Sequence, residues 1–150
     1  MPEIGERAPD FTATTDAGEQ ISLSSLRGKK VVLYFYPRDN TPGCTQEACD
    51  FRDREEALAA KDAVVLGVST DSVASHQNFK AKHALPFTLL ADPDKELVSA
   101  YGVYREKKQY GRSYMGTVRT TFVIDEEGTI ANVFNSVKVK GHADAVLESL

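Results

Sequence analysis

Two short, unbroken apolar runs stand out in the pattern of hydrophobic and polar positions. Val31 to Tyr36 is a β-branched and aromatic run that Pro37 ends, and Ala63 to Val68 is the second run, in an expected strand from Ala63 to Ser69. Apolar runs without polar alternation are typical of strands that are covered on both faces. We therefore expect both segments at the centre of a sheet, between layers of helices.

Helical patterns follow these two strands. The segment from about Thr41 to Ala60 predicts one helix, and Ser72 to His83, with Pro86 after it, predicts a second. Lys95 to Tyr101 and His142 to Leu150 predict two shorter helices. Strands that alternate with helices in this way are expected to be joined by right-handed crossovers.

Two pairs of short β-rich segments flank turn-rich tetrads and predict hairpins. The pairs are Phe11 to Thr15 with Gln20 to Leu23, and Thr120 to Ile124 with Thr129 to Phe134. Thr88 to Ala91 predicts a further strand, Ser24 to Gly28 a single helical turn, and the basic, glycine-dotted Tyr104 to Gly116 a loop. The fold class is therefore α/β, with a central mixed β-sheet, helices on both faces and an N-terminal β-hairpin.

Length and charge exclude several classes of function. The 150 residues fall within the size of one domain, which we expect to span residues 1–150. Lys and Arg number 18 against 22 Asp and Glu, a net charge of −4, which argues against nucleic-acid and anionic-membrane binders. The apolar runs are too short to span a bilayer, and no basic segment precedes an apolar stretch at the N-terminus. We therefore expect a cytoplasmic protein.

The 2 cysteines are too few for a disulfide scaffold, but their positions suggest chemistry. Thr41 is a good N-cap and Pro42 suits the first helical position, so Cys44 is expected in the first turn of a helix. This turn lies beyond the carboxyl end of a buried strand, where open α/β folds place their active sites. Its free backbone N–H groups and the helix dipole favour an anion, and therefore a thiolate.

Cys49 is expected on a different face of the same helix. At about 100° per residue, Cys44 heads the apolar stripe, Cys49 points about 140° away, and the two Cα atoms would be roughly 8.6 Å apart. A disulfide requires less than about 7 Å between Cα atoms, so the first helical turns would have to unwind. That suits a catalytic disulfide better than a structural one. The residues alone leave open that Cys44 is an inert small hydrophobe.

A longer motif surrounds the cysteines. Pro37-x-x-x-Thr41-x-x-Cys44, followed by Glu47, resembles the active-site motif of the peroxiredoxins, which are thiol peroxidases with a thioredoxin-like fold. The stretch Tyr34 to Asp53, with Cys49 five residues after Cys44, is similar to the Q-type subfamily, also called bacterioferritin comigratory proteins.

Distant segments extend the resemblance over essentially the whole chain. Arg119-x-Thr121-Phe122-x-Ile124-Asp125 resembles the strand that carries the active-site arginine of that family. The lead-in Gly5-x-x-Ala8-Pro9-Asp10-Phe11 and the segment Tyr110-Gly111-Arg112 also fit.

The resemblance implies that Cys44 is the peroxidatic cysteine, whose thiolate attacks a hydroperoxide and becomes a sulfenic acid. Thr41 would accept a hydrogen bond from the peroxide O–H, and Arg119 would stabilise the thiolate and the charge on the leaving oxygen. Pro37 would shield the thiolate from water, and Gly43 would let the backbone approach the substrate.

Two further residues complete the implied site. Glu47 would orient Arg119, although a surface or capping carboxylate is an equally open interpretation of its first-turn position. Cys49 is implied as the resolving cysteine, which forms an intramolecular disulfide with Cys44 that thioredoxin or a similar dithiol reductant reduces. An internal resolving cysteine favours a monomer.

The resemblance implies no cofactor, and the 3 histidines are dispersed without metal-ligand spacing, so we expect no metal. A peroxide sensor that uses the same cysteines stays open as an alternative function. A thioredoxin-like disulfide oxidoreductase is disfavoured, because the C-x-x-C spacing is absent.

Overall fold

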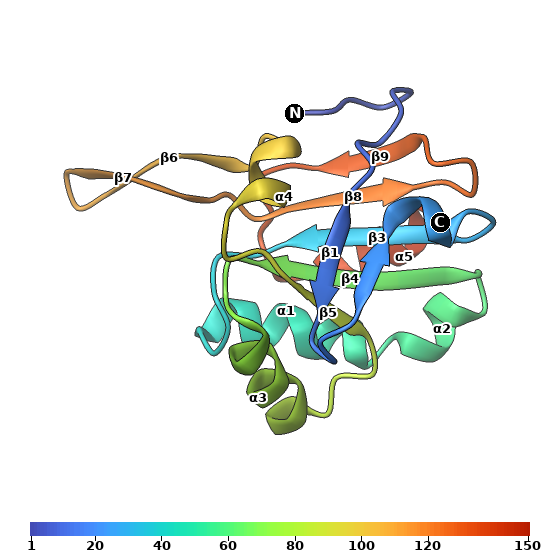
Figure 1. Cartoon of the computed structure of the whole chain (residues 1–150), viewed down its shortest axis with the longest axis horizontal. Coiled ribbons are helices and arrows are strands. Elements are labelled where there is room, and N and C mark those ends of the chain that lie inside the picture. Colours follow the sequence, from blue (N-terminus) through green and yellow to red (C-terminus); the bar gives the residue numbers. More distant parts are fainter.

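The computed structural model describes residues 1–150 and arranges seven strands in one mixed sheet (Figure 1). These strands are β1 (Thr12–Thr15), β2 (Gln20–Ser22), β3 (Lys30–Phe35), β4 (Ala63–Ser69), β5 (Thr88–Ala91), β8 (Thr120–Ile124) and β9 (Ile130–Phe134). Their order is β2-β1-β5-β4-β3-β8-β9. β3, β4 and β5 are parallel, and the remaining pairs are antiparallel. The mixed sheet and the N-terminal hairpin of β1 and β2 confirm the sequence prediction.

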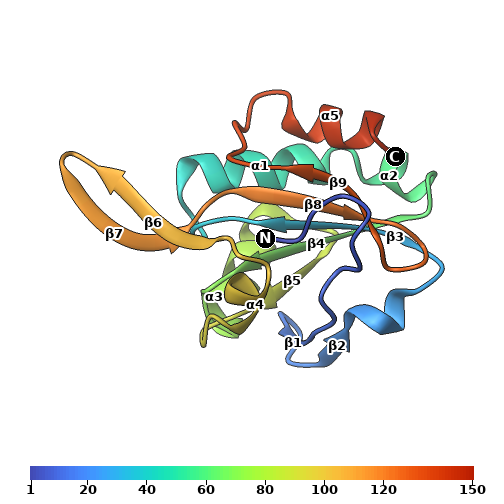
Figure 2. The same cartoon turned by 90° about the horizontal axis from the view of Figure 1, so that it is seen from above.

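Helices cover both faces of this sheet. They are η1 (Leu23–Leu26), α1 (Pro42–Arg52), α2 (Glu55–Ala59), α3 (Val73–His83), α4 (Glu96–Ala100) and α5 (His142–Glu148). Seen from above, α1, α2 and α5 lie along one face and α4 lies on the other (Figure 2). No helix combines the length and the apolar character that crossing a membrane requires.

Side chains of β3 alternate between two hydrophobic cores. Leu33 and Phe35 enter the core that includes Leu97 of α4, whereas Val32 and Tyr34 enter the core that includes Phe51 of α1. All four of these β3 side chains are fully buried, and burying Val32, Leu33 and Phe35 stabilises the fold by roughly 1.5–3 kcal/mol each. The apolar run in the sequence thus corresponds to a central strand that is buried on both faces.

The segment Tyr104 to Gly116 is not the loop that we expected. It forms most of a two-stranded hairpin, β6 (Tyr104–Gln109) and β7 (Arg112–Thr117), that projects from the body of the molecule (Figure 1). Tyr110 and Gly111 form the turn, with φ values of 52° and 75°, as a two-residue hairpin turn requires. Most of its side chains are exposed, so no apolar alternation marks the strands in the sequence.

The helix expected over Thr41 to Ala60 is two helices, because α1 ends at Arg52 and α2 begins at Glu55. Arg54 lies between them and donates a hydrogen bond to the carbonyl of Asp50 at 2.8 Å. The same guanidinium binds the carboxylate of Asp144 on α5, at 2.6 and 3.0 Å. This side chain therefore satisfies a free carbonyl at the end of α1 and links α1 to α5.

Candidate active site

The first turn of α1 lies beyond the carboxyl end of β3, as the sequence predicts. Thr41 has an extended backbone (φ −81°, ψ 152°), and Pro42 occupies the first helical position, where its missing N–H has no helical partner to lose. Cys44 follows in the same turn and is only 1% exposed. Its sulfur is thus buried next to the free N–H groups of a helix N-terminus.

Arg119, from the link between β7 and β8, contacts Cys44 across the fold. Its Nη2 donates a hydrogen bond to Cys44 Sγ at 3.3 Å, and its Nη1 donates to Glu47 Oε1 at 2.6 Å. Burial lowers the pKa of Arg119, but the charges of Glu47 and Cys44 outweigh it and hold that pKa above its ordinary value. The Glu47 side chain is 1% exposed, so its interpretation as a surface carboxylate is wrong.

The second oxygen of Glu47 has no hydrogen-bond partner. This Oε2 lies 3.9 Å from Nε2 of His142 on α5, which contacts the hydroxyl of Thr121 at 2.8 Å instead. Burial raises the pKa of Glu47 to about 7, although Arg119 opposes the shift. Burial and the charge of Arg119 lower the pKa of His142 to about 4. At neutral pH His142 is therefore uncharged, and Glu47 can bind or release a proton beside Arg119.

Thr41 occupies the N-cap position of α1, but its hydroxyl does not cap the helix. Instead, Oγ1 donates to the carbonyl of Arg38 at 3.1 Å, which leaves the oxygen lone pairs free to accept a hydrogen bond. Gly43 lies against the guanidinium, and a Cβ at this position would lie 3.3 Å from Arg119 Nη2, which is closer than ordinary van der Waals contact.

A cavity of about 500 Å³ adjoins this turn. Pro37 and Thr41 line one side of it, and Lys107 and Tyr114 of the β6–β7 hairpin contribute to the rest of the lining. The hairpin that the sequence analysis did not find therefore forms part of the surroundings of the candidate site.

Cys49 is half-buried, and both cysteines are free thiols. The backbone N–H of Thr45 donates to the Thr41 carbonyl and that of Asp53 donates to the Cys49 carbonyl, each at 2.9 Å, so the helical hydrogen bonding extends from the first turn past Cys49. The folded helix thus holds Cys44 in the core and Cys49 at a partly exposed position, which agrees with the separate faces expected from the sequence.

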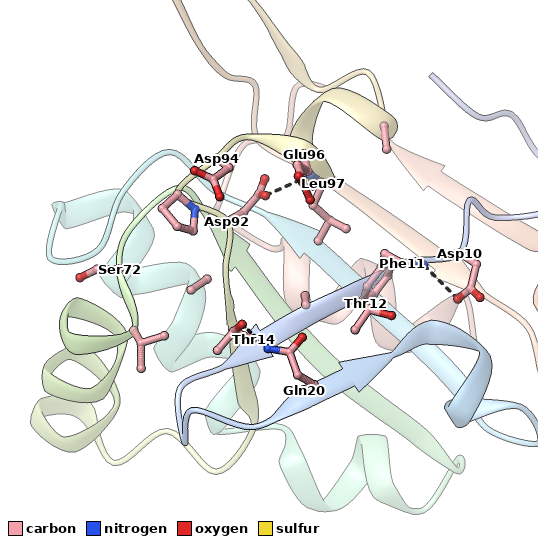
Figure 3. Close-up of a pocket in the computed structure, with 15 residues that line it drawn as sticks. Asp10, Phe11, Thr12, Thr14, Gln20, Ser72, Asp92, Asp94, Glu96 and Leu97 are labelled. Atoms are coloured by element: carbon pink, nitrogen blue, oxygen red, sulfur yellow. Dashed lines mark hydrogen bonds between the residues drawn. The ribbon is translucent and has the colours of Figure 1, made fainter.

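Another large cavity, of about 530 Å³, lies away from the cysteines, between β1 and the loop after β5 (Figure 3). Asp92, Asp94 and Glu96 give it an acidic lining. The Asp92 carboxylate accepts hydrogen bonds from the backbone N–H groups of Leu97 and Val98, at 3.1 and 2.9 Å. This carboxylate therefore satisfies the N-terminus of α4, and none of the predicted site residues lines the cavity.

Comparison with known proteins identifies the family of this chain. Residues 4–133 match the AhpC/TSA family. The chain belongs to this family. It is 51% identical to peroxiredoxin Bcp of Bacillus subtilis (strain 168), over 99% of this chain and 94% of that protein. It is 41% identical to peroxiredoxin Bcp of Escherichia coli (strain K12), over 99% and 95% of the two chains.

Solved structures extend the match of this AhpC/TSA protein to three dimensions. A cysteine-to-serine mutant of Xylella fastidiosa PrxQ has a TM-score of 0.94 at 36% identity, covering 99% of this chain and 94% of that one. The bacterioferritin comigratory protein of Xanthomonas campestris has a TM-score of 0.92 at 40% identity, covering 98% and 96%. The protein is therefore a peroxiredoxin of the Bcp or Q type, a thiol peroxidase with a thioredoxin-like fold, which confirms the resemblance seen in the sequence.

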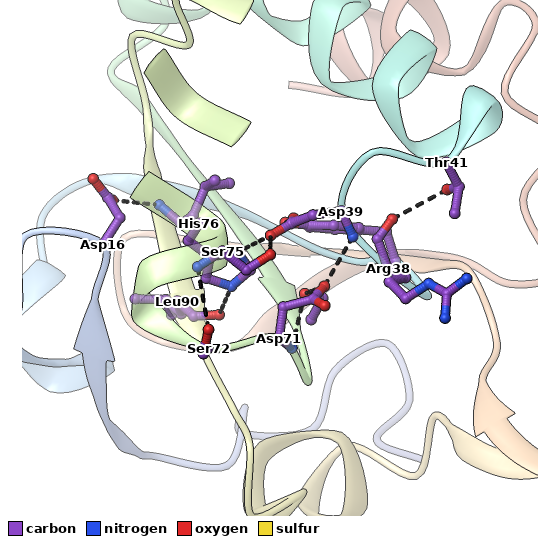
Figure 4. Close-up of polar contacts among 12 residues, drawn as sticks. Asp16, Arg38, Asp39, Thr41, Asp71, Ser72, Ser75, His76 and Leu90 are labelled. Carbon is purple, nitrogen blue, oxygen red and sulfur yellow. Dashed lines mark hydrogen bonds and ion pairs between the residues drawn. The ribbon is translucent and has the colours of Figure 1, made fainter. Parts of the chain in front are cut away.

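Sequence reasoning missed two polar clusters near the site. One is the pair of His142 and Thr121. The other brings Asp39, Asp71 and His76 together, with one potential ligand atom from each residue lying within 4.8 Å of the others (Figure 4). Asp39 is more than 30 residues away from the other two in the sequence, so only the fold shows that the three are neighbours.

Proposed function

We propose that Cys44 is the peroxidatic nucleophile of this thiol peroxidase. Its thiolate attacks one oxygen of a hydroperoxide, an S–O bond forms as the O–O bond breaks, and the other oxygen takes up a proton and leaves as water or an alcohol. The observation that carries this proposal is the 3.3 Å hydrogen bond from Arg119 to the Cys44 sulfur, in the first turn of α1. Guanidinium and helix N–H groups both favour the thiolate and stabilise the charge that develops on the leaving oxygen.

The neighbouring residues complete the reaction site in this proposal. Thr41 accepts a hydrogen bond from the peroxide O–H through its free lone pairs and so aligns the O–O bond with the sulfur. Gly43 leaves room for the peroxide beside Arg119, and Pro37 shields the thiolate from water. Glu47 holds the guanidinium in place through the 2.6 Å contact with Nη1.

Cys49 acts as the resolving cysteine. Its thiol attacks the sulfenic sulfur of Cys44, the sulfenic oxygen leaves as water, and an intramolecular disulfide forms. The continuous hydrogen bonding of α1 supports a gate, since the first turns have to unwind before the sulfurs can meet. A dithiol protein such as thioredoxin then reduces the disulfide by exchange, which returns both thiols and transfers the disulfide to the reductant.

Further properties follow from this cycle. The substrates are hydrogen peroxide and organic hydroperoxides, and the cavity that includes Tyr114 supports the entry of an organic group. All the chemistry is carried by cysteines, so no cofactor is required. An internal resolving cysteine needs no second subunit, and we propose a single-domain monomer, spanning residues 1–150, that acts in the cytoplasm in antioxidant defence.

Peroxide turnover tests the proposal. Reduced protein is mixed with hydrogen peroxide or cumene hydroperoxide, together with thioredoxin, thioredoxin reductase and NADPH, and NADPH consumption is followed. Continuous turnover is expected for the wild type and none for Cys44→Ser, whereas Cys49→Ser, the matched control, is expected to be oxidised by peroxide without turnover. Stoichiometric oxidation of the wild type, with no turnover in the presence of reductant, would contradict the proposal.

A further inference from the structure

A buried polar network anchors the active-site loop to α3 (Figure 4). Asp39 lies in the loop between β3 and α1, and its Oδ2 is 2.7 Å from Nδ1 of His76 and accepts from Ser75 Oγ at 2.8 Å. Its Oδ1 accepts from the hydroxyl of Tyr36 at 2.6 Å. The side chains of His76 and Asp39 are 0% and 1% exposed, so the anchor is shielded from water.

His76 is engaged at both of its ring nitrogens. Its second nitrogen, Nε2, lies 2.9 Å from the carbonyl oxygen of Leu90. Both ring nitrogens of His76 therefore have partners within the chain, a carboxylate oxygen on one side and a backbone carbonyl on the other. Burial raises the pKa of Asp39, but hydrogen bonds from His76 and Tyr36 outweigh it and hold that pKa below its ordinary value. Since apolar groups of the same shape often stabilise a core as well as a buried hydrogen-bonded pair does, this network calls for an explanation beyond packing.

One peptide group connects the network to Thr41. The backbone N–H of Asp39 donates to Asp71 Oδ2 at 2.8 Å, and the carbonyl of Arg38, in the same planar peptide, accepts from Thr41 Oγ1 at 3.1 Å. Asp71 Oδ2 is itself held by the hydroxyl of Ser69, at 2.6 Å. Because the peptide is planar, holding its N–H end fixes the direction of its carbonyl, and the carbonyl fixes the direction of the Thr41 proton.

We propose that Asp71, together with the Asp39–His76 pair, is a positioning group for the peroxide. The network holds the 38–39 peptide so that Thr41 directs its proton to the Arg38 carbonyl and its lone pairs toward the O–H of the substrate. This inference rests on the function proposed above, and none of the three network residues contacts the Cys44 sulfur.

Asp39, Asp71 and His76 also lie close enough together to hold a metal ion. Their potential ligand atoms, however, already contact other groups of the chain. Both oxygens of Asp39 and both nitrogens of His76 contact partners within the chain, as does Oδ2 of Asp71. A cation would have to displace these contacts, whereas the positioning role uses all of them.

Substitutions at Asp71 test the proposal, because this half-buried residue can change without opening the core. Stopped-flow oxidation of Cys44 by hydrogen peroxide should be about tenfold slower in Asp71→Ala, since the 38–39 peptide loses its acceptor. Asp71→Asn keeps an oxygen that can accept from the Asp39 N–H and should restore the rate to within about twofold of wild type. Asp94→Ala, which removes an exposed carboxylate, is the matched control and should leave the rate unchanged.

Alkylation and a double-mutant cycle separate positioning from a general structural role. Alkylation of Cys44 by iodoacetamide should be unchanged in Asp71→Ala, because Thr41 has no part in it. In a Thr41→Val background there is no hydroxyl to orient, so Asp71→Ala should slow the peroxide reaction less than about twofold further. His76→Gln, which breaks the anchor from the other side, should act in the same direction as Asp71→Ala.

Three results would overturn this inference alone. They are a wild-type peroxide rate in Asp71→Ala, an equal slowing of alkylation and peroxide reaction, and a full Asp71→Ala effect that persists without the Thr41 hydroxyl. A wild-type protein whose Cys44 does not react with peroxide would instead overturn the proposed function, and this inference with it.

Discussion

Replacing Glu47 by glutamine is expected to remove a pH dependence from the stability of the folded protein. Burial raises the pKa of this carboxyl from 4.5 to about 7, so between these values the folded state holds a proton that the unfolded chain has released. The free energy of unfolding therefore contains a contribution that is fully present below pH 4.5 and is lost as the pH rises to 7. Glutamine does not titrate, and its amide oxygen can still accept the hydrogen bond from Arg119.

The size of the effect follows from the shift. A difference of about 2.5 pKa units at about 1.4 kcal/mol per unit corresponds to about 3 kcal/mol. Urea unfolding of the reduced wild type and of Glu47→Gln, at a series of pH values from 4.5 to 8, measures it directly. The wild type should lose about 3 kcal/mol relative to the variant across this range, at up to about 1.4 kcal/mol per pH unit.

Glu127→Gln is the matched control, because this carboxylate is exposed and should give a difference that does not change with pH. A pH-independent difference for Glu47→Gln as well would refute the reasoning. It would mean that the pKa of Glu47 is the same in the folded and unfolded states, because Arg119 compensates fully for its burial.

The remaining predictions concern reactivity. Arg119→Met removes the hydrogen bond to Cys44 and should slow oxidation by peroxide about 10²–10³-fold in stopped-flow measurements, and a loss of less than tenfold would argue against its role. Cys49→Ser should leave the first oxidation of Cys44 within about twofold of wild type but convert Cys44 to the sulfinic acid under excess peroxide, as mass spectrometry would detect. Gly43→Ala places a methyl group 3.3 Å from Arg119 Nη2 and should lower kcat/KM for hydroperoxide about tenfold, so an unchanged kcat/KM would show that the space is not needed.

The central elements of the fold could be predicted from local sequence patterns, because strands that are buried on both faces consist of apolar residues. β3 is covered by both cores, and its apolar run in the sequence extends from Val31 to Tyr36. The β6–β7 hairpin buries almost none of its side chains, so its strands have no apolar face to reveal them, and only the Tyr110-Gly111 turn marks them. Arg54, which lies in the break between α1 and α2, pairs with Asp144, and no local pattern contains this contact between distant segments.

The candidate site was predictable to the extent that it lies within one turn or a recognisable motif. Cys44 and Thr41 are neighbours in the sequence, and the structure places both where a strand-to-helix turn requires. Arg119 was identified because the segment around it resembles a segment of the family, and not because of its spacing from Cys44. The network of Asp39 and His76 was missed because a lone histidine on a polar helix carries no sign of a partner 37 residues away.

Mass spectrometry of the peroxide-treated protein tests the central claim most directly. Reduced protein is treated with one equivalent of hydrogen peroxide at low protein concentration, alkylated, digested without reduction and searched for linked peptides. The account predicts a disulfide between Cys44 and Cys49 within one chain, and its absence in the variants Cys44→Ser and Cys49→Ser. A link between two chains, or a Cys44 sulfenic acid that persists beside an unmodified Cys49, would contradict it.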